Sequence, residues 1–221
     1  MLARLYCAWA ILSIAGPIAI SGLDAQATTR VLVVALLALE LGLGRHIVRL
    51  SEWIPLRARF VVLGTLLACV VEGFHMISKP VFASLTVARD TPVSVALERY
   101  AIDLAFTVPA YLVILAVIER LARYYRYTFW EYVFVMALGQ TLGDGGIFFF
   151  ASAPALLAFL PYPMTNYHAL NVLPYLGIQG ELSPDRSSSR RRFLAVPLLI
   201  GVYLVCGALI KWVGRSLGFE G

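Results

Sequence analysis

The amino-acid sequence predicts an all-α protein, a polytopic bundle of transmembrane helices. Three observations lead to this class: 60% of the 221 residues are apolar, only 14% are charged, and the mean hydropathy is +0.81. Soluble domains carry roughly 25% charged residues. The length alone would suggest one or two soluble domains, so the composition decides the class. We expect a single integral membrane domain over residues 1–221.

Seven stretches with few or no charges define the expected helices. About 20 helical residues cross a bilayer, and most of these stretches reach that length once their flanks are included. They cover residues 5–23, 31–44, 60–78, 104–118, 132–143, 145–180 and 193–210.

Two of these stretches have boundary signals of their own. The helix that contains 104–118 is expected to begin at Thr91 and Pro92, because a capping side chain there precedes a proline, and to run to about Tyr125. The stretch 145–180 is too long for one helix and carries Pro161, Pro163 and Pro174, which interrupt helical hydrogen bonding. We expect a helix to about residue 160, followed by a broken aromatic segment near 161–180.

The number of crossings depends on residues 143–146, with the sequence Gly-Asp-Gly-Gly. If this segment is a turn, the bundle has seven helices, and if the chain crosses once there it has six. The positive-inside rule favours seven with a cytoplasmic N-terminus, because the basic loop at about 181–192 then lies inside. Arg30 and Lys79 are then among the fewer outer charges.

The net charge of +5 therefore reflects topology and not a nucleic-acid partner, since no soluble basic domain is present.

The first apolar stretch is long enough for a membrane span, although a secretory signal cleaved near residue 27 is the alternative. Cys7, Cys69 and Cys206 lie in apolar stretches without C-x-x-C spacing, which indicates neither a disulfide framework nor a zinc ribbon. We expect the protein in a bacterial inner (plasma) membrane.

Glu72 is the most informative single residue, because it lies near the end of the apolar stretch 60–78. A charge at that depth costs about 2.5–3.5 kcal/mol unless it is protonated, paired or facing a wet cavity. Intramembrane acids are therefore functional candidates by default. At 1.5 Å per residue, Glu72 lies roughly 9 Å, and His75 roughly 5 Å, below the outer end of this helix. The three-residue spacing places both side chains on one helical face.

Four titratable groups are expected to converge in the outer leaflet as catalytic candidates: Glu72, His75, Asp103 and Asp144. Structural alternatives stand beside three of them. Asp144 could be a solvated turn residue, Asp103 could pair with Arg99 four positions earlier, and His75 could bond a backbone carbonyl. Glu72 has no cation at its depth within the segment, so a structural role would need a partner from another helix.

Glu40 lies in the middle of the stretch 31–44 without a local partner, which makes it a candidate proton relay toward the cytoplasm. Three aromatic residues, Phe74, Phe106 and Tyr111, are expected to line an apolar substrate pocket, where ring faces stabilise positive charge. Glu-x-x-His occurs once, whereas a carboxylate-bridged di-iron site needs two copies. The sequence indicates no metal and no cofactor.

Two resemblances to membrane enzymes rest on short features. Residues 141–144 approach the Gly-x-Gly-Asp motif of intramembrane aspartyl proteases but lack its first glycine. The size and the intramembrane acids among aromatics resemble the membrane-bound terpene cyclases, with Glu72 corresponding to an acid of that family. Val71 stands where that family would have Trp. We assign the chain to neither family.

The leading functional expectation is an integral membrane enzyme acting on a lipid or isoprenoid substrate. Glu72 would be the general acid or base, and Asp103 and His75 would tune or share its proton. The main alternative is a proton-coupled small-solute transporter or channel, which needs Glu40 to face the same cavity as Glu72. The second alternative is a non-catalytic membrane partner subunit, whose acids would point outward onto an apolar surface.

Overall fold

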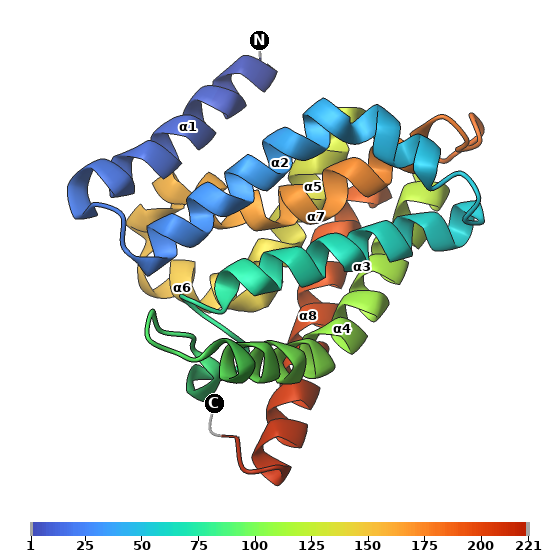
Figure 1. Ribbon diagram of the computed structural model, residues 1–221. Coiled ribbons are helices and arrows are strands. Elements are labelled where there is room, and N and C mark those ends of the chain that lie inside the picture. The colour runs from blue at the N-terminus through green and yellow to red at the C-terminus, as the bar shows by residue number, and fades with distance from the viewer. Residues whose placement is uncertain (1, 220–221) are drawn as a thin grey trace.

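The computed structural model describes residues 2–219, and over these residues the protein is an all-α bundle, as predicted (Figure 1). The α-helices are α1 (Leu2–Ser21), α2 (Ala25–Leu50), α3 (Leu56–His75), α4 (Val93–Tyr124), α5 (Phe129–Thr141), α6 (Ile147–Ser152), α7 (Pro161–Gln179) and α8 (Ala195–Ser216). A π-helical segment, η2 (Leu142–Gly146), joins α5 to α6. Three 3-10 helices complete the chain: η1 (Ala83–Leu85), η3 (Pro154–Phe159) and η4 (Arg190–Leu194).

Within residues 2–219, five helical segments are long and apolar enough to cross a membrane, which makes the chain an integral membrane protein. They are Ala25–Leu50, Leu56–His75, Val93–Tyr124, Phe129–Ser152 and Arg190–Ser216. A shorter apolar helix covers Arg4–Ile20 within α1. The predicted bounds of α4 are confirmed to within a residue or two. The hydroxyl of Thr91 accepts from the Ala88 N–H, however, and Pro92 takes the N-cap position.

Residues 143–146 are not a reversal of the chain, which corrects the turn predicted there. α5 continues through η2 into α6, so that Phe129–Ser152 forms one candidate span. The backbone leaves helical geometry only locally, at Asp144 (ψ 37°) and Gly145 (φ 88°). The α-helix then ends at Ser152, and not near residue 160, and η3 leads into α7.

The predicted broken segment near 161–180 is also wrong, because residues 161–179 form the regular helix α7. Pro161 and Pro163 fall in its first turn, where backbone N–H groups have no intrahelical partner to lose. Most residues of α7 are buried, and the helix packs against α2, α3 and α5. Figure 1 shows α7 passing through the middle of the bundle. The polar residues of α7 lower its mean hydropathy. The distribution of apolar residues in the sequence therefore did not reveal that a central helix lies here.

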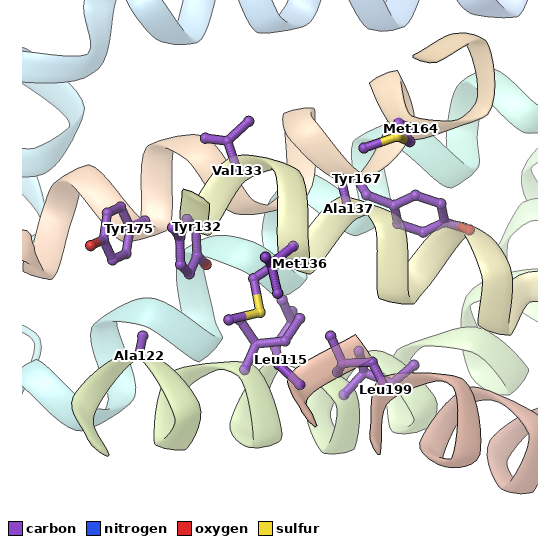
Figure 2. Close-up of a cluster of buried hydrophobic side chains, with 14 of the residues drawn as sticks. Leu115, Ala122, Tyr132, Val133, Met136, Ala137, Met164, Tyr167, Tyr175 and Leu199 are labelled. Carbon is purple, nitrogen blue, oxygen red and sulfur yellow. The ribbon is translucent and has the colours of Figure 1, made fainter. Parts of the chain in front are cut away.

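The largest core cluster holds α5 between α7, α4 and α8 (Figure 2). The rings of Tyr132 and Tyr175 stack with 3.7 Å between centroids, and both residues are fully buried. α5 begins at a capping box, in which Thr128 and Glu131 satisfy each other's backbone N–H groups. This packing fixes the start of α5, and the segment η2 that follows α5 carries Asp144.

The basic loop around 181–192 lies at the end of the bundle where α3 begins. Arg59, near the start of α3, pairs with Glu181, and Arg186 donates to the Ala122 carbonyl near the end of α4. His75 lies at the opposite end of α3, about 24 Å away at the helical rise of 1.5 Å per residue. The acids and His75 that the sequence singled out in the outer leaflet therefore lie far from the basic end.

Candidate functional site

Two neighbouring cavities occupy the end of the bundle away from the basic loop. Cavity A, of about 680 Å³, lies between α1, α2, η3 and the η2–α6 segment, and is closed by the start of α7. Cavity B, of about 580 Å³, lies between α3, α4, η2, α7 and α8. Both volumes fall within the range of small-molecule sites. The residues that line both cavities form a shared wall: His75, Lys79, Asp144, Gly145, Asn166 and Tyr167.

Glu72 lines cavity B and has the interhelical partner that its depth requires. The hydroxyl of Tyr111, on α4, donates to Glu72 Oε1 at 2.5 Å. Both side chains line cavity B and are half-buried. Glu72 is therefore neither a lone charge in the core nor a group facing outward to lipid. A hydrogen bond donated to a carboxylate is among the stronger bonds in proteins.

Asp144 lines both cavities and sits in the π-helical segment η2. The hydroxyl of Tyr167, on α7, donates to its Oδ2 at 2.8 Å. Gly145 adopts a positive φ that side chains disfavour, and this backbone kink turns Asp144 toward the shared wall. π-Helical insertions of this kind occur frequently at functional sites. Asp144 is exposed and lies at this local break in the helix, and its bond to Tyr167 shows that it also has a protein partner there.

Tyr203, on α8, is the third tyrosine that lines cavity B, after Tyr111 and Tyr167. Its hydroxyl donates to Gln140 Oε1, on α5, at 3.0 Å, and both residues are buried. Tyr203 approaches η2 closely because Gly143 has no side chain there. A Cβ at Gly143 would lie 2.6 Å from the Tyr203 Cβ. The glycine thus lets α8 bring this phenol to the wall that holds Asp144.

His75 is held by an amide on α7 and not by a backbone carbonyl. Asn166 Nδ2 lies 3.0 Å from His75 Nε2, and Asn166 Oδ1 accepts from Arg30 Nη1 at 2.5 Å. Because arginine can only donate, the amide oxygen must face Arg30 and the amide nitrogen must face His75. His75 Nε2 is then the acceptor, and the ring carries its proton on Nδ1. Arg30, Asn166 and His75 therefore form one chain of contacts from cavity A to the shared wall.

Arg30 lies in the first turns of α2 with only 6% of its surface exposed. Its guanidinium carbon lies 4.4 Å from the centroid of the Tyr162 ring. Guanidinium groups stack favourably on aromatic faces. The sequence had counted Arg30 only as an outer charge, whereas the structure places it within the protein at the wall of cavity A.

Two acids that the sequence singled out do not line either cavity. Asp103 is fully buried, and its Oδ1 accepts from the Val81 N–H at 2.7 Å, so it anchors the segment between α3 and α4. Its predicted pairing with Arg99 is not formed, because Arg99 donates to the Thr86 carbonyl. Glu40 is 2% exposed, and neither carboxyl oxygen has a hydrogen-bond partner within residues 2–219. Its role as a proton relay stays a prediction.

Only one of the three aromatic residues predicted to line the substrate pocket lines a cavity. Tyr111 lines cavity B, whereas Phe106 packs with Phe82 and Phe219, and Phe74 packs beside the cluster around Val33. The aromatic residues of α6 supply part of both walls: Phe148 lines cavity B, and Phe149 and Phe150 line cavity A. In the described part of the chain, no three His, Cys, Asp or Glu side chains gather closely enough to hold a metal ion.

The arrangement supports proton transfer within an apolar surround. Cavity B presents two carboxyl groups, each hydrogen-bonded to a tyrosine, beside a neutral imidazole edge at the shared wall. Such groups can donate or accept protons at a substrate within hydrogen-bond reach.

The sequence did not predict four of the residues that line the cavities: Arg30, Asn166, Tyr167 and Tyr203. The polar run from Thr165 to His168 inside an otherwise uncharged stretch was the signal that would have found the α7 residues.

Comparison with known proteins adds no relative to this description. No family model matches the chain, and neither a curated protein nor a solved structure matches it.

Proposed function

We propose that the protein is a membrane enzyme that performs acid–base chemistry on a lipid or isoprenoid substrate in a bacterial inner membrane. One observation carries the proposal: the Glu72–Tyr111 and Asp144–Tyr167 pairs line the same cavity. Acid–base catalysis needs a proton donor and a proton acceptor positioned around one substrate. Two carboxyl–tyrosine pairs around one cavity meet that requirement.

The roles follow from the contacts. Glu72 exchanges a proton with the substrate, and Tyr111, whose hydroxyl already points at its carboxyl, stabilises the charged form that results. Asp144 and Tyr167 are the second donor–acceptor pair on the shared wall. His75 contributes an imidazole edge that Asn166 holds in one orientation.

The surround of cavity B suits a hydrocarbon substrate. Its walls include Val71, Ile114, Phe148, Leu204 and Ile210, all apolar. Ligand sites of this kind combine apolar walls with a few converging polar groups. By the positive-inside rule, the basic end of the bundle faces the cytoplasm, so the cavities lie toward the outer leaflet. A lipid or isoprenoid chain would reach them from the bilayer.

The alternative functions receive less support from the same geometry. A transport pathway across the bilayer would need Glu40 in the cavity of Glu72, and Glu40 lines neither cavity. A partner subunit that used its acids to bind another protein would direct them outward. Glu72 and Asp144 instead line cavities and take hydrogen bonds from tyrosines.

The test is a comparison of lipids from bacterial cells that express the wild type, Glu72→Gln, Asp144→Asn or the control Glu98→Gln, by untargeted mass spectrometry. Glu98 is exposed on α4 and lines neither cavity. We expect lipid species that change with the wild type and with Glu98→Gln. These changes should fall by about 100-fold or more with Glu72→Gln, since general acid–base catalysis contributes 10²–10⁴-fold.

Two results would count against an enzyme. The first is a Glu72→Gln variant that changes the lipids as fully as the wild type does. The second is a proton flux in liposomes containing the purified protein that Glu40→Gln abolishes, without any lipid product. The second result would favour the transporter.

A further inference from the structure

Arg30 is a buried cation with a donor that has no acceptor. Its Nη1 donates to the Asn166 amide oxygen, whereas its Nε has no hydrogen-bond partner within residues 2–219. No ion pair involves Arg30 in that part of the chain. A buried polar atom without a partner costs free energy, so most such atoms in folded proteins are satisfied by protein, water or ligand.

The guanidinium is also oriented for recognition. The guanidinium carbon lies over the Tyr162 ring, and Arg30 lines cavity A. A planar fork of donors matches the oxygen atoms of a phosphate group in a bidentate manner. Lys79 lines the same cavity and adds a second cation.

The acids of cavity A already have protein donors. Asp24 caps α2 by accepting from the Ala27 N–H at 2.7 Å, and Asp144 accepts from the Tyr167 hydroxyl. Neither acid forms an ion pair with Arg30 within residues 2–219. The shared wall joins this cation site to the apolar cavity B, which holds Glu72.

We infer that cavity A binds the phosphate head group of a phosphorylated amphiphile through Arg30, and that the hydrocarbon chain passes the shared wall into cavity B. The head-group site is independent of turnover, whereas the placement of the chain beside Glu72 rests on the proposed function. Together the two assign the substrate class: a phosphorylated lipid or isoprenoid.

Binding of radiolabelled dodecyl phosphate to the purified full-length protein in neutral detergent micelles tests this inference. We expect saturable binding that unlabelled dodecyl phosphate displaces, while dodecanol and inorganic phosphate displace it only at concentrations at least tenfold higher. Arg30→Gln should weaken binding at least tenfold. The control Arg89→Gln, an exposed arginine that lines neither cavity, should bind as the wild type does.

A second variant keeps the inference falsifiable if Arg30→Gln does not fold. Arg30→Lys retains the charge but loses the planar fork, so binding should weaken several-fold. Unchanged binding by the folded Arg30 variants would overturn the site. Equal displacement by inorganic phosphate would overturn the lipid assignment, and equal displacement by dodecanol would overturn the phosphate contact.

Glu72→Gln separates this inference from the proposed enzyme activity. Its binding of dodecyl phosphate should still depend on Arg30, because Glu72 does not line cavity A: the double variant Arg30→Gln/Glu72→Gln should bind at least tenfold more weakly than Glu72→Gln. Normal lipid conversion by Glu72→Gln together with weak binding by Arg30→Gln would refute the proposed role of Glu72 and leave the head-group site standing.

Discussion

Gly143→Ala tests the close contact between η2, which follows α5, and α8, a contact that brings Tyr203 toward the shared wall. An alanine Cβ at this position would lie 2.6 Å from the Tyr203 Cβ and 3.1 Å from the Ile200 Cα. Both of these atoms belong to or directly adjoin the α8 backbone, so no side-chain rotation relieves the overlap. α8 has to move away from η2, and we expect the variant to be less stable than the wild type.

The magnitude follows from the cost of overpacking, which is about 1–3 kcal/mol. Because backbone atoms have to move, we expect the upper part of that range, about 2–3 kcal/mol, or roughly 30- to 150-fold in the unfolding equilibrium. Gly201→Ala, on the same helix α8, is the matched control. No atom lies within 4 Å of its added Cβ, so it should be neutral or stabilised by up to about 1 kcal/mol.

The assay is unfolding of the purified variants by SDS titration in mixed micelles, followed by circular dichroism and tryptophan fluorescence. Gly143→Ala should unfold at a lower SDS fraction than the wild type, and Gly201→Ala at the same or a higher one. If both variants unfolded at the same SDS fraction as the wild type, η2 and α8 would not be in close contact at Gly143, and the placement of Tyr203 would be wrong.

Two further predictions concern hydrogen bonds. Tyr111→Phe removes the bond to Glu72, and a bond to a charged group contributes about 1.5–3 kcal/mol, so lipid conversion should fall about 10- to 100-fold. Tyr100→Phe removes a similar bond to the Cys69 carbonyl outside both cavities and should leave conversion unchanged; equal rates for the two variants would contradict the role of Tyr111. Arg59→Gln should cost about 2 kcal/mol in SDS unfolding, because a buried guanidinium loses bonds to three carbonyls and Glu181. Glu181→Gln should cost less than about 1 kcal/mol because that carboxyl is 53% exposed, and a larger loss would refute this account of the pair.

Hydropathy predicted the outer helices well and the central helix poorly. α2, α3, α4 and α8 are recognisable because they present apolar residues toward lipid as well as toward the core. α7 contacts other helices on most of its surface, so it can carry Asn166, His168 and Asn171 and falls below the hydropathy of a span. The prolines do not interrupt α7 as expected, because two of the three occupy its first turn, where they remove no hydrogen bond.

The candidate site was predicted in part. Glu72, His75 and Asp144 were singled out as charges inside apolar sequence, and the structure brings all three to cavity B. Asp103 satisfied the same criterion, but its carboxyl anchors the Val81 backbone behind the cavity. Depth along a helix can be counted from sequence, whereas the direction of a side chain around the helix depends on its neighbours. Counting residues along the helices therefore could not show that Glu72 lines the cavity and that Asp103 does not.

By itself, the sequence determined that this is an integral membrane protein and which of its acids are too deep to be ordinary surface charges. Those conclusions follow from the free energy of placing each residue type in hydrocarbon, which is a property of the residue and its local segment. Only the tertiary structure decided that Tyr111 and Tyr167 hold two of those acids around one cavity, and that Arg30 faces the next. These pairings join residues 23 to 136 positions apart, and interhelical packing, not local sequence, sets such contacts.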